Sequence, residues 1–186
     1  MTSIHASEPA RLAPRLFAVA ATLFATPALA DYVIAPTGGD ISGARLSAQL
    51  AAGDVSLAAA SGNLVVDDAV NWSAHTLTLS APSGSVNVNA VMTASGSASL
   101  SLETDASAAD GGVAMALTAG GFTGRVDFTG TGQSYKVNGT AYTLIHTLAE
   151  LEAIRPPANG TITGAYALAA DVDWSGAVSQ TPLGFL

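Results

Sequence analysis

Hydrophobic residues stand in short apolar-x-apolar pairs that recur along the middle of the chain, between residues 53 and 103. Val55 and Leu57 form the first pair, and Leu77 and Leu79 repeat it further along the chain. Side chains two positions apart lie on the same face of a strand. Each pair therefore predicts a strand with one buried face.

The same spacing holds for further pairs along this stretch. These are Leu64 and Val66 with Val86 and Val88, and Leu77 and Leu79 with Leu100 and Leu102. Ser-Gly turns separate the pairs, so each repeat holds two strands and a corner. Hairpins require tight two-residue loops, and a Greek-key sandwich, the structural rival, has no reason to repeat at this length. We predict an all-β fold, a parallel β-helix (solenoid) with coils of about 22 residues.

One or two short helices accompany the strands. Ser42 is the predicted N-cap of a helix of about two turns, in which Leu46 and Leu50 share one face. Thr147 is the N-cap of a second helix, with Glu150 at the capping-box position. We expect the first helix to cover the first coil, because exposed strand edges invite aggregation.

The beginning of the chain has the pattern of a secretory signal peptide, residues 1–30. Two arginines precede an apolar run of ten residues, 16–25, and a small-x-small site ends at Ala30. The run is shorter than the roughly 20 residues that a membrane anchor needs. We expect cleavage near Ala30. The product, residues 31–186, is expected to be secreted or displayed on the surface, and we do not expect it to be an integral membrane protein.

The charge of the expected mature chain limits the kinds of partner that it can bind. After residue 30 the chain has four basic and thirteen acidic side chains, and it has no cysteine. A strongly acidic chain argues against nucleic acid as a partner. Stability must come from packing and backbone hydrogen bonds, since no disulfide can form.

The sequence predicts no catalytic, cofactor-binding or metal-binding residue. Asp67 and Asp68 are the best acidic pair, but neighbours on a strand point to opposite faces, which indicates a solvated corner. Asp171 and Asp173 are best explained by a structural turn. The histidines are His5, His75 and His146, which lack the spacing of a zinc site. The dispersed aromatic residues, for which core packing is expected, are Trp72, Trp174, Tyr135, Tyr142 and Tyr166.

Two segments of the second half carry a family resemblance: GRVDFTGTGQSYKVNGTAYTLIHTLAELEAI, which begins at Gly124, and GAYALAADVDWSG, which begins at Gly164. Together with the repeats, they resemble the β-helical passenger segments of filamentous-haemagglutinin-like exoproteins and large autotransporter adhesins, over roughly residues 39–176. The chain departs from that family in lacking Asn-Pro-Asn motifs, a C-terminal membrane-barrel segment and a long repeat array. We expect residues 31–186 to be an N-terminal passenger piece, truncated at its C-terminus.

The resemblance implies a right-handed parallel β-helix that is displayed outside the cell and acts in structure and adhesion without catalysis. It also implies an outer-membrane transporter for export and a protein or glycan partner on a host or neighbouring cell. Two alternatives stay open. One is a carbohydrate-active β-helix enzyme, a polysaccharide lyase or hydrolase, and the other is a non-functional fragment of a larger adhesin.

Overall fold

The computed structural model describes residues 31–105, 107, 112–154, 162–173 and 175. The predicted signal peptide and the predicted C-terminal truncation lie outside these residues, as do His5, Trp174 and most of the stretch between Thr104 and Gly112.

The described chain is mostly β-sheet, with two short helices, so the prediction of an all-β fold is confirmed. The helices are α1 (Gly43–Leu50) and α2 (Leu148–Ala153). The strands are β1 (Tyr32–Ile34), β2 (Val55–Ala58), β3 (Leu64–Val66), β4 (Val70–Trp72), β5 (Thr76–Ala81), β6 (Val86–Val88), β7 (Val91–Ala94), β8 (Ser99–Thr104), β9 (Val113–Met115), β10 (Leu117–Thr118), β11 (Gly121–Phe122), β12 (Arg125–Phe128), β13 (Ser134–Val137), β14 (Thr140–Ile145) and β15 (Tyr166–Leu168).

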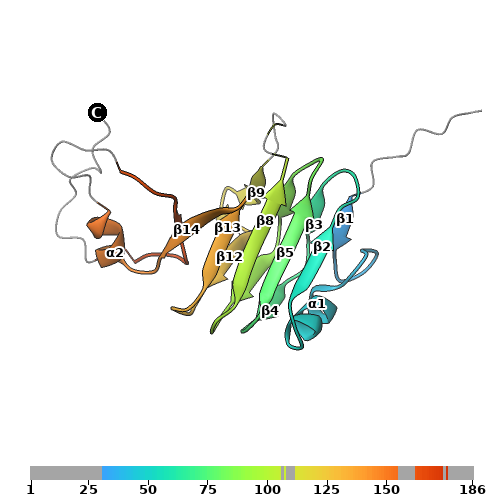
Figure 1. Cartoon of the computed structure of the whole chain (residues 1–186), viewed down its shortest axis with the longest axis horizontal. Coiled ribbons are helices and arrows are strands. Elements are labelled where there is room, and N and C mark those ends of the chain that lie inside the picture. The colour runs from blue at the N-terminus through green and yellow to red at the C-terminus, as the bar shows by residue number, and fades with distance from the viewer. Residues whose placement is uncertain (1–30, 106, 108–111, 155–161, 174, 176–186) are drawn as a thin grey trace, which may run out of the picture.

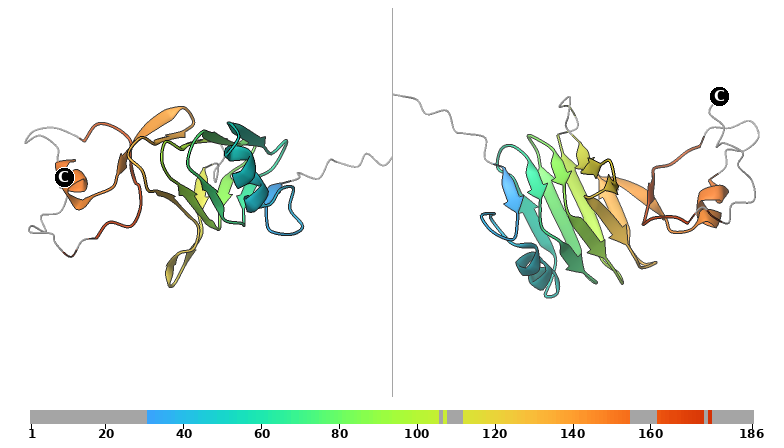
Figure 2. Two further views of the ribbon diagram at one scale, coloured as in Figure 1. Left: turned by 90° about the horizontal axis from the view of Figure 1, so that it is seen from below. Right: turned by 180° about the vertical axis from the view of Figure 1, so that it is seen from behind.

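Successive strands of the chain belong to three different sheets, one strand to each sheet in turn. One has the order β1-β3-β6-β9, the second β4-β7-β12, and the third contains β2-β5-β8-β13, all with parallel pairing. The chain therefore passes through three-strand units: β2, β3 and β4, then β5, β6 and β7, then β8, β9 and β12. Figure 1 shows these strands side by side, and Figure 2 shows the same stack from below and from behind.

The predicted repeat spacing matches the registers of the parallel pairs. Val55 pairs with Leu77 across β2 and β5, and Leu77 pairs in turn with Leu100 across β5 and β8. The third unit is longer than predicted, because Met92 pairs with Val126 and the antiparallel β10–β11 hairpin lies before β12. The periodic pairs thus specify which strands meet, while the hairpin carries no periodic signal.

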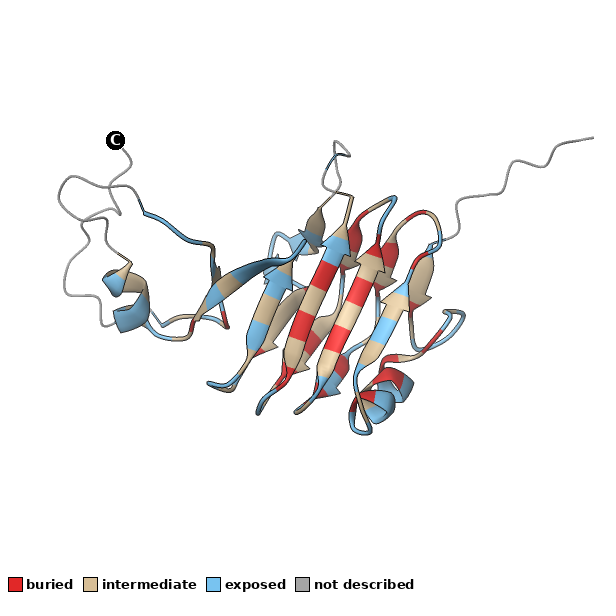
Figure 3. Ribbon diagram, viewed as in Figure 1, coloured by how far each residue is buried: buried red, intermediate tan, exposed pale blue. Residues whose placement is uncertain are grey.

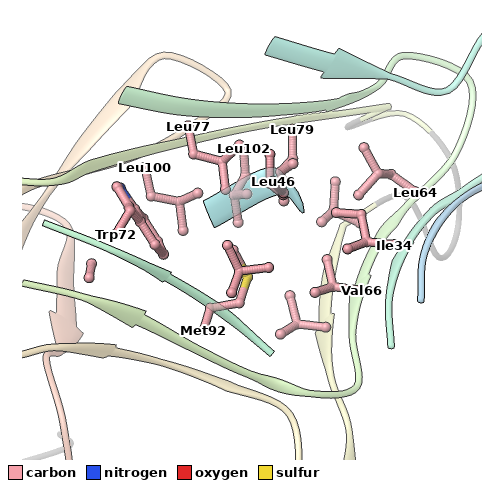
Figure 4. Packing of buried hydrophobic residues seen from close by; sticks show 14 of the residues in the cluster. Ile34, Leu46, Leu64, Val66, Trp72, Leu77, Leu79, Met92, Leu100 and Leu102 are labelled. Atoms are coloured by element: carbon pink, nitrogen blue, oxygen red, sulfur yellow. The ribbon is translucent and has the colours of Figure 1, made fainter. Parts of the chain in front are cut away.

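The core lies between the three sheets. Leu77, Leu79 and their partners on β8 point inward from one sheet, toward Leu64 and Val66 of the second and Met92 of the third (Figure 4). These side chains have between 0 and 1% of their surface exposed. Strands β3 to β8 each have two or three buried residues, whereas β13 has none and β14 has one (Figure 3).

Helix α1 packs over the first unit, as the sequence predicts. The Ser42 side chain accepts a hydrogen bond from the backbone N–H of Arg45, and Leu46 and Leu50 are fully buried in the core. Amphipathic spacing at i and i+4 places both leucines on the face toward the sheets. The helix lies at one end of the stack, beside β2 and β4 (Figure 1).

The opposite end of the stack is arranged differently. Asn138 and Gly139 both have positive φ, 48° and 77°, and join β13 to β14 in an antiparallel hairpin, as expected of an Asn-Gly turn. The hairpin leads to α2, which is capped by Thr147 and Glu150 as predicted and stands away from the stack (Figures 1 and 2).

Candidate functional site

The best acidic pair predicted from the sequence serves the fold. The backbone N–H of Gly43, at the start of α1, donates to Asp68 Oδ2 at 2.8 Å, and that of Ala69 donates to Asp68 Oδ1 at 2.9 Å. Asp67 Oδ1 accepts from the side-chain amide of Asn89 at 2.7 Å. Asp67 is exposed, as expected of a solvated corner, and Asp68 is half-buried and also accepts a hydrogen bond from the distant backbone N–H of Gly43.

Polar side chains at other corners also form hydrogen bonds with the following three-strand unit. The backbone N–H of Thr76 donates to Asp54 Oδ1 at 2.7 Å, and that of Ser85 donates to Asn63 Oδ1 at 2.9 Å. His75 Nδ1 lies 3.7 Å from the same Asp54 oxygen. The side chains of Asp54 and Asn63 thus each satisfy a backbone donor of the following unit.

The described residues contain no cluster of three His, Cys, Asp or Glu side chains that could hold a metal ion. Asp173 accepts a hydrogen bond from the backbone N–H of Ser175 at 2.9 Å, and this bond lowers the pKa of its carboxyl group. This agrees with the expected structural turn. Asp171 is placed differently, at the wall of a pocket.

A pocket surrounds β12, at the end of the stack opposite α1. It has a volume of about 560 Å³, within the range that is typical of ligand-binding clefts. Its walls come from β9, the β10–β11 hairpin, β12, β13 and the segment from Ala167 to Asp171. We call it the β12 pocket.

The inner wall of the β12 pocket is the last layer of the core. Met115, Val126 and Tyr135 belong to β9, β12 and β13, one from each of the three parallel sheets. All three pack against the core and stay partly exposed at this end. Burial, followed by the neighbouring Tyr142, raises the pKa of the Tyr135 phenol to about 12, so this wall is neutral at physiological pH.

The outer wall carries charge. Arg125 Nε donates to Asp127 Oδ1 at 2.9 Å and to Asp127 Oδ2 at 3.0 Å. The hydrogen bond to Asp127 raises the pKa of the Arg125 guanidinium, and the charge of Asp171 raises it further. One guanidinium and two carboxylates therefore leave the pocket with a net charge of about −1 at neutral pH.

Large apolar side chains are exposed near this end of the chain. Phe122 and Leu168 line the pocket with 59% and 57% of their surface exposed, and Leu117 on β10 is 65% exposed. In the described residues every exposed large hydrophobic side chain follows residue 116. Leu117 and Phe122 are register partners on the β10–β11 hairpin, so these two exposed side chains lie side by side.

Three aromatic rings that are apart in the sequence meet here. The ring centroids of Phe128 and Tyr135 lie 5.5 Å apart, and those of Tyr135 and Tyr142 lie 5.3 Å apart. The prediction that Tyr135 and Tyr142 are dispersed is wrong, because β13 and β14 form a hairpin that places them opposite each other. Cross-strand pairing at an Asn-Gly turn is the sequence signal that could have shown this contact.

No protein-family model, curated protein or solved structure matches this chain. Among the described residues, no helix has the length and apolar character needed to cross a membrane. The β12 pocket combines an apolar inner wall with an outer wall that carries the Arg125–Asp127 ion pair.

Proposed function

We propose that this protein is a secreted or surface-displayed structural and adhesive module, built as a right-handed parallel β-helix of the filamentous-haemagglutinin-like type. The observation that carries the proposal is the parallel register of the repeated pairs, with Leu77 paired to Leu100 and Leu79 to Leu102. Long in-register ladders build a stiff body whose binding surface lies along its outside and at its ends.

Three features support a β-helix. Each of three sheets gains one strand per unit, inward side chains stack in like positions, and corner side chains bind the backbone of the following unit. In this architecture every unit buries its apolar face only against its neighbours, so a stack is required for stability. The handedness follows from the rule for parallel crossover connections.

The adhesive role is supported by the exposed apolar side chains around the β12 pocket. Phe122 and Leu168 offer aromatic and aliphatic surface, which provides most of the binding energy in protein interfaces. The proposed partner is a protein or glycan on a host or neighbouring cell, and an outer-membrane transporter is the proposed route of export after cleavage near Ala30.

The test is attachment of cells to the purified protein, residues 31–186, immobilised on a surface. Saturable attachment that soluble protein inhibits supports the proposal, with heat-denatured protein as the control. Absence of attachment to every cell type tested, together with retention of the protein inside the producing cell, contradicts it.

A carbohydrate-active enzyme is the second candidate, favoured by one observation: Arg125, Asp127 and Asp171 line a single pocket. Glycoside chemistry requires such carboxylates, often with a basic group near an acidic sugar. Incubation with acidic polysaccharides, followed by measurement of unsaturated or reducing-end products, separates the candidates. Turnover that Asp127→Asn abolishes establishes the enzyme and overturns the proposal of a non-catalytic module.

A further inference from the structure

The edge of β12 that faces away from β7 lies at the β12 pocket, which Arg125, Val126 and Asp127 line. Backbone N–H groups alternate in direction along a strand. The N–H of Thr129 donates to Ala94 of β7 at 2.8 Å, whereas that of Phe128 points away from β7 and donates to Ala169 at 2.6 Å. By this alternation the backbone N–H of Val126, two residues before Phe128, also points away from β7.

This edge already pairs with an extended segment of the chain at one point. The carbonyl of Ala169 accepts the Phe128 hydrogen bond, directly after β15. In the described structure it is the one backbone hydrogen bond between β12 and this segment. Val126, Ala170 and Asp171 also line the β12 pocket. Strand pairing along this edge of β12 is thus formed at Phe128. In the described residues no further backbone hydrogen bond to this segment continues the pairing toward Arg125.

The two faces of β12 would present different surfaces to an added strand. Val126 and Phe128 face the core, beside their register partners Met92 and Ala94, while Arg125 and Asp127 lie on the other face. Alternate side chains of an added strand would therefore meet an apolar wall and a charged wall.

Charge determines which strand fits. Asp127 neutralises Arg125, Asp171 leaves an excess negative charge, and the whole chain has a formal net charge of −8. A strand with Lys or Arg at its outward positions is attracted to this wall. A second copy of this acidic chain brings like charges together and is disfavoured.

We propose that the β12 pocket binds an extended segment of a partner protein by strand addition to the edge of β12, and that this segment alternates apolar and basic residues. The proposal rests on the proposed adhesive function, because it names the class of partner through which attachment occurs. Main-chain hydrogen bonds to Val126 supply affinity, and the two walls supply the sequence preference.

The probe is an acetylated and amidated heptapeptide that alternates valine and lysine, titrated into the protein and followed by calorimetry and by amide chemical shifts. We expect saturable binding, with shifts concentrated at Val126 and Ala170. Peptides that alternate valine with glutamate, or that carry N-methyl groups on the strand-pairing nitrogens, should bind at least tenfold more weakly. Equal binding of the N-methylated peptide overturns the proposal.

A variant pair tests the edge itself. Val126→Pro removes an N–H that points away from β7, which proline tolerates at an edge, and Val126→Thr keeps the donor at similar volume. We expect a loss of about tenfold in peptide affinity for Val126→Pro and little change for Val126→Thr. If Val126→Pro does not fold, the N-methylated peptide still decides the question.

Two further outcomes separate this inference from the proposed function. Cell attachment by Val126→Pro at the level of the unaltered protein overturns the strand-addition site and leaves the adhesive role intact. Peptide binding without any cell attachment supports the site and contradicts the adhesive role. Concentration-dependent dimerisation in the ultracentrifuge that Val126→Pro abolishes assigns the edge to a second copy and overturns the proposed partner.

Discussion

At the scale of single residues, the fold depends on alternation between buried and outward positions within each strand. Leu77, Leu79 and Ala81 of β5 are completely buried, while Thr76, Thr78 and Ser80 between them are half-buried and point outward. Period-two alternation is visible in the sequence, so these inward positions are predicted without a structure.

The first prediction compares two charges on one strand. Leu79→Asp places an unpaired carboxylate in the core and should lower the free energy of unfolding by more than about 4 kcal/mol. Thr78→Asp, the matched control on the outer face, should cost less than about 1 kcal/mol. Urea denaturation followed by circular dichroism measures both, and equal midpoints contradict the inward assignment.

Asp68→Ala should have an intermediate cost. The variant loses the acceptor for the backbone N–H of Gly43 at the start of α1, a loss of about 1 kcal/mol. Asp67→Ala is the control, because Asp67 binds only the side chain of Asn89 in the described structure. Equal stability of the two variants in urea contradicts the structural role of Asp68.

Gly124 is the clearest position where glycine is required by close packing. A Cβ at this residue would overlap with the carbonyl oxygen of Val88, whereas a Cβ at Gly120 would meet only Thr118 Oγ1, at 3.8 Å. Gly124→Ala should therefore destabilise the protein by more than about 2 kcal/mol, and Gly120→Ala by less than about 1 kcal/mol. A thermal melt of Gly124→Ala that matches the unaltered protein would show that the chain before β12 does not approach β6 as closely as described.

At the scale of elements, capping signals predict both helices well. The N-caps Ser42 and Thr147 are local, and each is satisfied within the first turn of its helix. The end of α1 carries no equally clear signal, since Ala51, the C-cap after its last residue, keeps a helical conformation. The β10–β11 hairpin is missed, because its two short strands do not show a period.

Helix α1 closes one end of the core, so its buried leucines should be costly to shorten. Leu46→Ala leaves a cavity at a fully buried position and should cost about 2–5 kcal/mol. Gln49→Ala, on the exposed face of the same helix, should be close to neutral. Chemical denaturation of both variants checks this, and a neutral Leu46→Ala would mean that α1 does not cover the core.

The capping box of α2 should respond to acid. Hydrogen bonds from the backbone N–H groups of His146 and Thr147 lower the pKa of the Glu150 carboxyl below its ordinary value of 4.5. A lowered pKa means that the carboxylate stabilises α2 above the ordinary pKa, and that this contribution is lost as the pH falls through the folded value. We expect the amide signals of His146 and Thr147 to shift together below pH 4.5, and Glu150→Gln to remove the transition.

At the scale of the whole molecule, stability should decrease from the α1 end of the stack to α2. Each strand from β3 to β8 has at least two buried residues, whereas β14, α2 and β15 contain one buried residue, Ile145, among those described. Amide hydrogen exchange should be slowest in β5 and at least tenfold faster in β14. Uniform protection across these strands contradicts a graded stability.

The sequence predicts the order of parallel strands but not the β12 pocket. Registers follow from repeated apolar pairs, such as Val55 with Leu77, because each pair is a local pattern. The pocket joins Met115, Arg125, Tyr135 and Asp171, whose proximity depends on how the long third unit and the β13–β14 hairpin turn. No periodic pattern or motif in the sequence indicates that these residues lie close together. Only the structure reveals the pocket.

The position of α1 has a consequence for the order of folding. The helix packs against the first three-strand unit, so these elements together form one finished end of the stack. Each later unit can then form on a template that is already complete, by contacts that span only one repeat of the sequence, such as Val55 with Leu77. Folding can therefore advance from a single edge, which moves along the stack away from α1.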